Sequence, residues 1–520
     1  MILLSLLLKG FFQGIGCFKG KEMKKKRYYP ISSTVFHQLF NFGRLHHYFT
    51  DLASHHKSFR FFAIGQSEIY TTDPANVEYI LKTNFSNYVK ACEDWIRSGL
   101  IPIGRESANQ NLYQGTKHYE VLSDLLGDGI FAVDGEKWRH QRRIASYDFS
   151  TKVLRDFSSH VFRSNAVKLA HAISDAATSK QIVDIQGLFM KSTLDSIFKV
   201  GFGAELDSLR GSSEEANQFA EAFDDSSALI FWRYVDPFWK LKRYFNIGSE
   251  SALKKKRKVI DEFVYKLIHS KEEEMSGQQD SVKKGDILSR YLVLRHDDPE
   301  WITNTYLRDI ILNFIMAGRD TTALTLSWFC YMLCKHPVLQ KKLAEEVKEA
   351  TNAAVSLSIE EFAATITEEA LNKMHYLHAA LTETLRLYPA VPVDGKLCQS
   401  DDTLPDGFDV REGDLVAYVP YAMGRMKFLW GEDAEDFRPE RWINADGIFQ
   451  PESPFKFTAF QAGPRVCLGK EFAYRQMKIF AAVLLNFFKF KLADEKQPVK
   501  YRTMLTLQID GGLHIQAHPA

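Results

Sequence analysis

The chain has 520 residues, of which 45% are hydrophobic and 13% aromatic, so it can bury a large core in one α-rich domain or in a few smaller ones. Its 66 Lys and Arg residues nearly balance its 65 Asp and Glu residues, and the net charge of +1 argues against a nucleic-acid-binding protein. The six cysteines include no Cys-x-x-Cys pair, which argues against a disulfide framework or a zinc site.

The first 27 residues combine an apolar start with a basic flank. Residues 1–18 are mostly apolar, but Lys9 interrupts them and they are shorter than the about 20 residues that span a bilayer. A basic cluster follows: Lys19, Lys21, Lys24, Lys25, Lys26 and Arg27. Positive charge beside an apolar segment stays on the cytosolic side and favours anionic lipid. We therefore expect 1–27 to be a retained membrane anchor with a basic flank, and 28–520 to form one globular domain.

Two short strands and a helix are predicted early in the globular part. Runs of β-branched and aromatic residues predict strands over 59–64 and 67–71. Further along the chain, Trp138 and Arg142 are four residues apart and therefore share one face of a predicted helix. From this pair alone, a surface helix with an aromatic anchor is the simpler interpretation.

A long helix is predicted over 301–336, ending before Pro337. Its middle reads Ala-Gly-Arg-Asp-Thr-Thr at 317–322, and Gly and Thr are poor choices inside a helix, where a Thr hydroxyl can bend the backbone. The pattern puts the acid of Asp320 beside the alcohol of Thr321, and such a pair can pass protons through ordered water. The alternative is a threonine satisfied by its own helix beside a surface aspartate.

Weaker patterns follow in the C-terminal third. Glu383 and Arg386 are three residues apart on one helical face, and Arg441 follows downstream. Such pairs are common on surface helices, so this one carries little weight by itself. Alternating apolar residues on both sides of an Asp-Gly-Gly turn predict a β-hairpin over 505–517.

Cys467 is the candidate metal ligand. It lies just before an apolar periodicity that predicts a helix over 468–488. Its sulfur is therefore expected near a helix N-terminus, where the dipole lowers the pKa of a thiol. For the cysteine alone, the simpler interpretation is a small buried hydrophobic residue.

The residues around this cysteine favour a large planar ligand with an acidic edge. Gly463 and Gly469 permit a tight turn and a close approach of the backbone. Arg465 suits a carboxylate, and Phe460 can pack beneath the ligand. A thiolate, a basic carboxylate clamp and an aromatic floor together describe the proximal side of a haem-thiolate site.

The pattern Phe-x-x-Gly-x-Arg-x-Cys-x-Gly at 460–469 resembles the haem-binding signature of the cytochrome P450 monooxygenases, and the similarity covers nearly all of 28–517. The resemblance implies a mainly α fold with small β-sheets (α+β). It further implies a triangular helical catalytic domain over 28–520, with haem b between the long central helix and the helix after the cysteine. Cys467 would be the axial ligand of the haem iron, surrounded by Phe460, Gly463, Arg465 and Gly469.

The same resemblance gives roles to the helical motifs. Trp138 and Arg142 are expected to contact the haem propionates. Asp320 and Thr321 are expected to be catalytic, because oxygen activation needs protons delivered without flooding the site with water.

The resemblance also implies a structural network and a substrate pocket. The network is a buried charge cluster that holds the loop leading to the cysteine; it consists of Glu383, Arg386 and Arg441. The pocket is expected to be apolar, as a hydrocarbon substrate requires; its predicted lining is Phe314, Ala317, Val391, Val393, Met504 and Leu505.

Narrower motifs resemble the plant fatty-acid ω-hydroxylase clan of this family. They are Leu-Leu-Gly-Asp-Gly-Ile-Phe at 125–131, Ala-Gly-Arg-Asp-Thr-Thr-Ala at 317–323, Tyr-Ala-Met-Gly-Arg-Met at 421–426 and Gly-Lys-Glu-Phe-Ala-Tyr-Arg-Gln-Met-Lys at 469–478. The implied reaction inserts one oxygen atom of O2 into a C–H bond at or near the terminal methyl group of a long-chain fatty acid. Electrons are expected from NADPH through a separate reductase, at the endoplasmic reticulum membrane with the catalytic domain facing the cytosol.

Two other functions are compatible with a haem-thiolate motif. One is an isomerase or dehydratase that rearranges lipid hydroperoxides without O2, and the other is a non-catalytic haem-binding or lipid-binding protein. Asp320 and Thr321 count against the first, because such enzymes need no proton relay. The complete relay and the apolar pocket count against the second.

Residues 91–114 depart from the pattern of the clan. They are polar and weakly patterned, and they separate Asn-Tyr-Val-Lys at 87–90 from Gly-Thr-Lys at 115–117, which the clan joins almost directly. We expect either an extra loop or an unspliced segment here, at a place where the family forms part of its substrate pocket.

Overall fold

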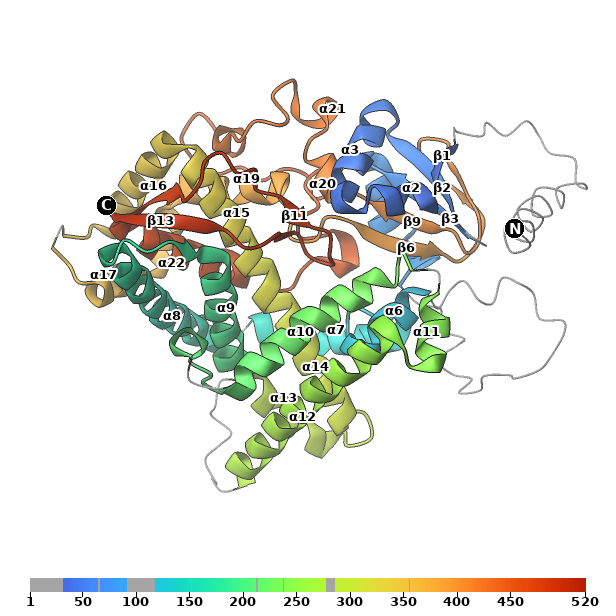
Figure 1. The fold of residues 1–520 in the computed structure, drawn as a ribbon, viewed down its shortest axis with the longest axis horizontal. Coiled ribbons are helices and arrows are strands. Elements are labelled where there is room, and N and C mark those ends of the chain that lie inside the picture. The colour runs from blue at the N-terminus through green and yellow to red at the C-terminus, as the bar shows by residue number, and fades with distance from the viewer. Residues whose placement is uncertain are drawn as a thin grey trace, which may run out of the picture. The chain divides into compact units, whose positions relative to one another are not determined.

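The computed structural model describes residues 31–63, 66–90, 117–150, 152–211, 214–236, 238–276, 286–354 and 356–520. Within this range, Ile31–Ala520 forms one compact unit (Figure 1). The expected anchor at 1–27 and the insertion at 91–114 lie outside the described residues. Among the helices of the described part, none has both the length and the apolar character that crossing a bilayer requires.

Helices make up most of the structure. In the N-terminal half they are α2 (Val35–Phe40), α3 (Leu45–His55), α4 (Pro74–Glu78), α6 (Lys117–Leu126), α7 (Gly135–Ser150), α8 (Lys152–Thr178), α9 (Ile185–Phe202), α10 (Glu214–Trp232), α11 (Trp239–Phe245) and α12 (Gly248–Ser276). They continue as α13 (Ile287–Asp297), α14 (Asn304–Ile315), α15 (Thr321–Lys335), α16 (Pro337–Thr351), α17 (Ile359–Thr365), α18 (Glu368–Lys373), α19 (His375–Leu387), α20 (Pro420–Met423), α21 (Lys427–Trp430) and α22 (Lys470–Phe487).

The strands are short and form separate small sheets. They are β1 (Ile31–Thr34), β2 (Ser58–Ala63), β3 (Gln66–Thr71), β4 (Tyr88–Val89), β5 (Val183–Asp184), β6 (Asp394–Cys398), β7 (Asp402–Thr403), β8 (Asp409–Val410), β9 (Leu415–Tyr418), β10 (Phe488–Leu492), β11 (Tyr501–Arg502), β12 (Gln508–Ile509) and β13 (His514–Pro519). Many helices with a few small sheets confirm the predicted mainly α fold.

The largest sheet joins distant parts of the chain. Its strand order is β1-β2-β3-β9-β6-β4. β2 and β3 are the two predicted strands, and they pair antiparallel with Ser58 opposite Thr71. β3 then pairs in parallel with β9, so residues beyond 400 complete a sheet that the N-terminal residues begin. In Figure 1 this sheet lies beside α2 and α3.

The hairpin predicted over 505–517 is wrong. β12 pairs with β11, whereas β13 pairs with β10 and β5, so the strands on the two sides of the Asp-Gly-Gly turn belong to different sheets. Turn chemistry and alternation are local signals, and they do not determine which partner a strand takes.

The helix predicted over 301–336 is built from three consecutive segments, α14, a π-helical turn η7 (Met316–Asp320) and α15. It begins later than predicted, because the Thr303 side chain accepts the Tyr306 N–H at 3.2 Å and caps the helix start. It ends before Pro337, which begins α16 as predicted. The wider turn falls on the stretch where glycine and threonine interrupt the helical pattern.

The two largest of four hydrophobic clusters in the described residues hold most of the helices together. The main core forms where α8, α9, α15, α19 and α22 pack against the C-terminal strands. In it the Trp328 ring of α15 stacks on Tyr388 at 4.2 Å, and its indole N–H donates to Leu507 O at 2.8 Å. The second core lies among α6, α10, α12 and α14. The central helix contributes to both, so its position is fixed from two sides.

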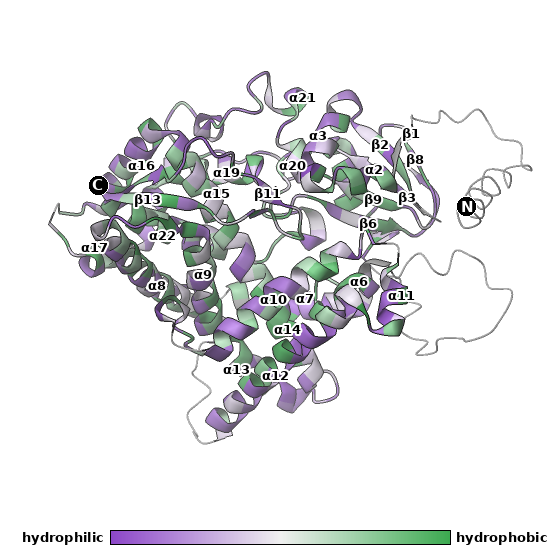
Figure 2. Ribbon diagram, viewed as in Figure 1, coloured by the Kyte–Doolittle hydropathy of each residue, from purple (hydrophilic) through white to green (hydrophobic). Residues whose placement is uncertain are grey.

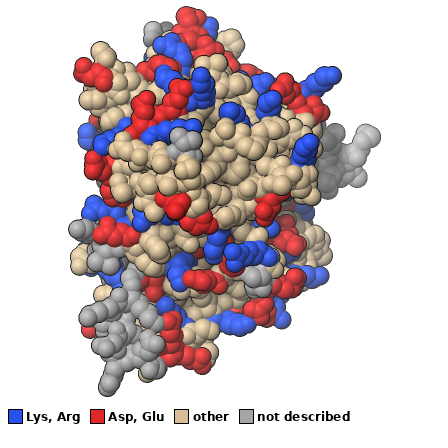
Figure 3. Space-filling model, turned by 90° about the vertical axis from the view of Figure 1, so that its left-hand side faces the viewer, with Lys and Arg blue, Asp and Glu red and all other residues tan. Residues whose placement is uncertain are grey.

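The surface shows no field of a single charge sign on the face drawn in Figure 3, where Lys and Arg alternate with Asp and Glu around an uncharged area. Hydrophilic and hydrophobic residues alternate along the outer helices in Figure 2, as expected for helices that cover a core on one side only.

Candidate active site

Cys467 ends a tight loop that leads into α22. Its backbone N–H donates to Phe460 O at 2.8 Å and closes the loop, and the Phe460 ring lies 5.2 Å from the ring of Tyr474 on α22. The Cys467 side chain is accessible to water, yet the residue is deeply surrounded by protein. A sulfur that faces an internal cavity explains both observations, whereas a close-packed core cysteine explains only the second.

Burial raises the pKa of the Cys467 thiol above its ordinary value, and this effect outweighs the Gly469 N–H, Arg142 and Lys470, which act to lower it. The backbone at the helix start therefore does act to lower this pKa, as predicted, but burial has the larger effect in the protein without a metal ion. An iron ion bound at the sulfur reverses the balance, because a coordinating thiol is deprotonated by the metal.

Arg465, Trp138 and Arg142 meet beside the cysteine loop. The Arg465 guanidinium lies 4.4 Å from the centroid of the Trp138 ring and pairs with the Asp134 carboxylate. Arg142, one turn after Trp138 on α7, donates to Val466 O. The face that these two residues share is therefore the face of α7 that meets the loop.

Two lysines that the sequence analysis does not identify also belong to the site. Lys396 on β6 is fully buried, and its Nζ has no hydrogen-bond partner among the described residues, with Asp394 Oδ2 3.8 Å away. Lys90 pairs with the same carboxylate, and its backbone N–H donates to Asp134. Burial, Lys90 and Arg465 all lower the pKa of Lys396. The sequence signal was the i, i+2 spacing of Asp394 and Lys396, which puts both on one face of a strand.

This cluster fits the acidic edge of a haem. Three buried cationic side chains, Lys90, Lys396 and Arg465, stand against the carboxylates of Asp134 and Asp394. A buried cation without a partner is costly unless an anion pairs with it. The accessible Cys467 and the cation cluster therefore offer one donor for an iron and several for the carboxylates of the same haem.

Gly463 lets the cysteine loop approach the N-terminal part of the chain. Its φ is +65°, and a Cβ at this position would lie 2.0 Å from Leu81 O. No other residue fits without a shift of one of the two backbones. Gly469 differs, because a Cβ there would make only ordinary contacts, 3.9 Å from Cys467 Sγ. The close approach predicted at Gly469 is therefore not required by the protein's own atoms.

Glu383 is the centre of a buried network. Its carboxylate accepts hydrogen bonds from Arg386 Nε and Nη2, both at 2.7 Å, and from Trp442 Nε1 at 2.9 Å. Arg441 Nε lies 3.3 Å from the same carboxylate. Arg386 uses its remaining donors on the backbone carbonyls of Gly424, Ala434 and Asp436. The network thus fixes the segment 424–442 to α19.

Asp320 and Thr321 lie at the end of the π-helical turn. Thr321 Oγ1 donates to Ala317 O at 2.6 Å, so its hydroxyl is satisfied by its own helix. Asp320 is buried rather than exposed, and it accepts a bond from Arg319 Nη1 at 3.3 Å. Burial raises the pKa of Asp320 to about 7, although Arg319 acts to lower it, while Asp224 raises it further. Such a carboxyl group can hold and release a proton at neutral pH.

The predicted pocket residues are divided between the borders of the two cores. Phe314 and Leu505 border the second core, and Val393 borders the main one. Val391 is 38% exposed and Met504 is buried. Ala317 is half-buried, one turn before Thr321. Phe314 and Leu505 therefore border the same core, whereas Val393 borders the other one.

Phe149 is a further residue of this region that the sequence analysis does not identify. Its ring lies 6.0 Å from the Phe314 ring of α14 and 5.9 Å from the Phe472 ring of α22. It thus connects the central helix with the helix that follows Cys467. A phenylalanine in a helical sequence is typical of any core, so no signal distinguished it.

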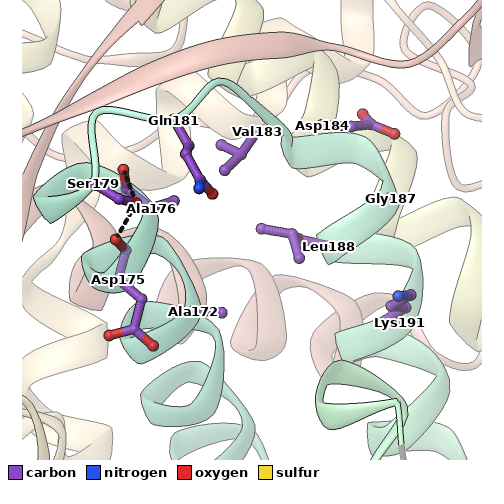
Figure 4. Close-up of a pocket in the computed structure, with 10 residues that line it drawn as sticks. All are labelled: Ala172, Asp175, Ala176, Ser179, Gln181, Val183, Asp184, Gly187, Leu188 and Lys191. Carbon is purple, nitrogen blue, oxygen red and sulfur yellow. Dashed lines mark hydrogen bonds between the residues drawn. The ribbon is translucent and has the colours of Figure 1, made fainter.

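A separate groove of about 570 Å³ lies between α8 and α9 (Figure 4). It is lined by polar and apolar side chains, among them Asp175, Asp184 and Lys191. Asp184 caps α9, where it accepts the Gln186 N–H at 3.1 Å. The groove shares no residue with the site around Cys467.

Comparison with known proteins agrees with this geometry. The sequence profile of the family described as Cytochrome P450 matches residues 106–515. Cytochrome P450 704C1 of Pinus taeda is 51% identical over 508 residues, covering 95% of this chain and 93% of the relative. Cytochrome P450 704B1 of Arabidopsis thaliana is 43% identical over 515 residues, covering 94% and 93%. Cytochrome P450 94A1 of Vicia sativa is 36% identical over 464 residues, covering 87% and 82%. The chain therefore belongs to the cytochrome P450 family, and it is a haem-thiolate monooxygenase.

Proposed function

We propose that this monooxygenase hydroxylates a long-chain fatty acid at or near its terminal methyl group. The observation that carries the proposal is apolar surface at the predicted pocket, where Phe314 and Leu505 stay partly accessible beside the second core and Val391 is exposed. Such a surface favours a hydrocarbon chain, because each buried CH₂ contributes about 0.8 kcal/mol. The sequence motifs that resemble the fatty-acid ω-hydroxylase clan support the same substrate class.

The residues that would hold the haem lie on three elements. Cys467 Sγ would bind the iron from the loop before α22. Trp138 and Arg142 on α7, with Arg465 of the loop, would contact the haem carboxylates, and the buried Lys396 Nζ adds a cation without a hydrogen-bond partner in the described structure. When bound, the haem supplies the activation of O2 and the oxidation of the C–H bond.

Residues of the central helix deliver protons to the active site. The hydrogen of the Thr321 hydroxyl is committed to Ala317 O, so the Thr321 oxygen is left to accept a hydrogen bond from a water. Asp320, with its pKa near 7, holds the proton that this water passes on. The apolar lining keeps further water out, which limits the supply of protons to this path. A hydroperoxide isomerase has no use for such a path.

The electron donor and the location are part of the same proposal. We infer that NADPH supplies electrons through a separate reductase, and that the basic segment 19–27 holds the chain at the endoplasmic reticulum membrane with its catalytic domain in the cytosol. The exposed side chains of Arg139 and Arg143 support docking of an acidic donor, because they lie on α7, the helix that contacts the cysteine loop.

The test is turnover of the purified holoenzyme with a plant NADPH–cytochrome reductase, a series of long-chain fatty acids and isotopically labelled O2. The proposal predicts one labelled oxygen atom in a hydroxyl group at or near the methyl end, formed only with NADPH. Rearrangement of lipid hydroperoxides without NADPH, together with no fatty-acid product, would contradict it and favour an isomerase.

A further inference from the structure

Arg319 connects the central helix to α10. Its Nη2 donates to Asp224 Oδ2 at 2.9 Å and its Nη1 bonds to Asp224 Oδ1, so the two side chains form a bidentate pair. The Arg319 side chain is 4% exposed, whereas the Asp224 side chain is 39% exposed. α10 crosses the central helix in this region (Figure 1). Neither haem binding nor the apolar pocket accounts for this pair.

Asp320 competes with Asp224 for the same guanidinium group. Its Oδ1 lies 3.3 Å from Arg319 Nη1, an atom that also bonds to Asp224. Arg319 and Asp224 are the charged groups that act on Asp320. α9, which also packs on this turn, presents the apolar Ile197, whose Cδ1 would lie 2.8 Å from a Cβ at Gly318. The protonation of the Asp320 carboxyl group therefore depends on how many hydrogen bonds Arg319 makes to Asp320 and how many to Asp224.

The geometry favours Asp224 in this competition. Two parallel bonds to one carboxylate are stronger than a single longer bond to another. If Asp224 lost its charge, the buried guanidinium would turn to Asp320, because a buried cation is costly without an anion. A closer positive charge favours the carboxylate form of Asp320, so the group would lose its proton more readily.

We propose that Asp224 is a positioning residue for proton delivery: it keeps the Arg319 guanidinium in a bidentate pair, leaves Asp320 only one longer bond to it, and thereby couples proton delivery to the placement of α10. A shift of α10 that separates Asp224 from Arg319 has the same effect as the loss of the Asp224 charge. This inference rests on the proposed role of Asp320, and it does not depend on which lipid is the substrate.

The experiment compares Asp224→Asn, Arg319→Gln and a control in the full-length holoenzyme. The control is Asp225→Asn, the neighbouring aspartate of α10, which pairs with Lys256 at 2.8 Å on the surface. Two quantities are measured against pH: product formed per NADPH consumed, and the infrared absorption of the protonated Asp320 carboxyl group, assigned with Asp320→Asn. The second needs neither substrate nor reductase.

Opposite shifts are expected. Asp224→Asn should lower the midpoint of both titrations by about 1 to 3 pH units, the range that a close opposite charge produces. Arg319→Gln should raise both midpoints, and Asp225→Asn should leave them unchanged. In the Arg319→Gln background, Asp224→Asn should shift the midpoint much less than it does alone, because its main effect passes through Arg319.

An infrared midpoint of Asp224→Asn equal to that of the parent would overturn the proposal, and so would equal shifts in the two backgrounds. If Asp224→Asn fails to fold, the same comparison is made with Asp224→Ser, for which the same shifts are expected. Should the infrared titrations shift as expected while no fatty acid is oxidised, the positioning role stands and the proposed substrate fails. If fatty acids are oxidised normally while the infrared titrations do not shift, the proposed substrate stands and the positioning role of Asp224 fails.

Discussion

The cysteine side and the central-helix side of the candidate haem site differ in how completely their buried charged groups are hydrogen-bonded. On the cysteine side, the Glu383 carboxylate accepts hydrogen bonds from Arg386, Arg441 and Trp442. The other N–H groups of Arg386 donate to backbone carbonyls. On the side of the central helix, Arg319 is divided between two carboxylates, and its Nε has no hydrogen-bond partner among the described residues. A fully satisfied network specifies one arrangement, whereas a guanidinium shared between two carboxylates can change how its bonds are divided.

The backbone shows the same difference. Near the cysteine network, a Cβ at Gly424 would lie 1.9 Å from Arg386 O, so the backbones are in direct contact. In the central helix the backbone instead widens into the π-helical turn before Thr321. Such turns are frequent at functional sites. The comparison indicates that the fold fixes the side of the proposed iron ligand and leaves the side of the proposed proton donor adjustable.

The largest effect is expected at the fixed side, from Cys467→Ser. Loss of the sulfur removes the proposed iron ligand, so hydroxylation should fall to the background of the assay, because the haem chemistry depends on its axial ligand. Cys334→Ser, a half-buried cysteine of α15, is the control and should retain activity. Product formation at equal protein concentration is the measurement, and normal turnover by Cys467→Ser would remove this residue from the site.

Glu383→Gln tests whether the cysteine side is held by its charge network. The substitution leaves Arg386 buried without its anion, which should destabilise the fold by about 3–5 kcal/mol. Thermal and denaturant unfolding measure this loss. The matched control is Glu432→Gln, whose exposed pair with Lys427 at 2.7 Å should contribute nothing measurable. If the two variants were equally stable, the Glu383 network would not be what holds the cysteine side in place.

Thr321→Ala tests the adjustable side. Removing the hydroxyl that is proposed to order a relay water should reduce product formed per NADPH by up to about 10²-fold, with the electrons released as peroxide. Thr325→Ala is the control, because Thr325 Oγ1 makes the same kind of bond, to Thr321 O at 2.7 Å, from a buried position one turn later. Unchanged coupling in Thr321→Ala would exclude the hydroxyl from proton delivery.

Lys396→Met should have a smaller effect, and its direction should differ between the haem-free protein and the haem-bound protein. Removing this buried ammonium, which has no hydrogen-bond partner among the described residues, should leave the haem-free protein at least as stable, because Asp394 keeps Lys90 and Tyr418 as partners. With haem, the lost charge-assisted bond should accelerate haem loss by about 10-fold, which corresponds to about 1.4 kcal/mol. Haem transfer to apomyoglobin and unfolding of the haem-free protein are the two measurements. Lys491→Met, an exposed lysine of β10, should change neither.

Much of the fixed side could be predicted from the sequence, because its signals are local. Cys467 and its glycines lie within ten residues, and Glu383 lies one helical turn from Arg386. The central helix and the strands β2 and β3 were predicted nearly to their ends, for the same reason.

The remaining features depend on contacts between distant residues. Lys90 meets Asp394 across 304 positions and Arg319 meets Asp224 across 95, and no spacing rule connects them. The partner of β12 and the raised pKa of the Cys467 thiol also follow from tertiary packing, which overrides the turn signal in one case and the helix terminus in the other.

The most direct test of a thiolate-bound iron at Cys467 is the absorption spectrum of the reduced, carbon-monoxide-bound protein, recorded for the parent chain and for Cys467→Ser with equal haem content. We expect the parent to show the red-shifted Soret band of a thiolate-ligated haem and the variant to lack it. The same band in both proteins, or in neither, would contradict the assignment of Cys467 as the ligand.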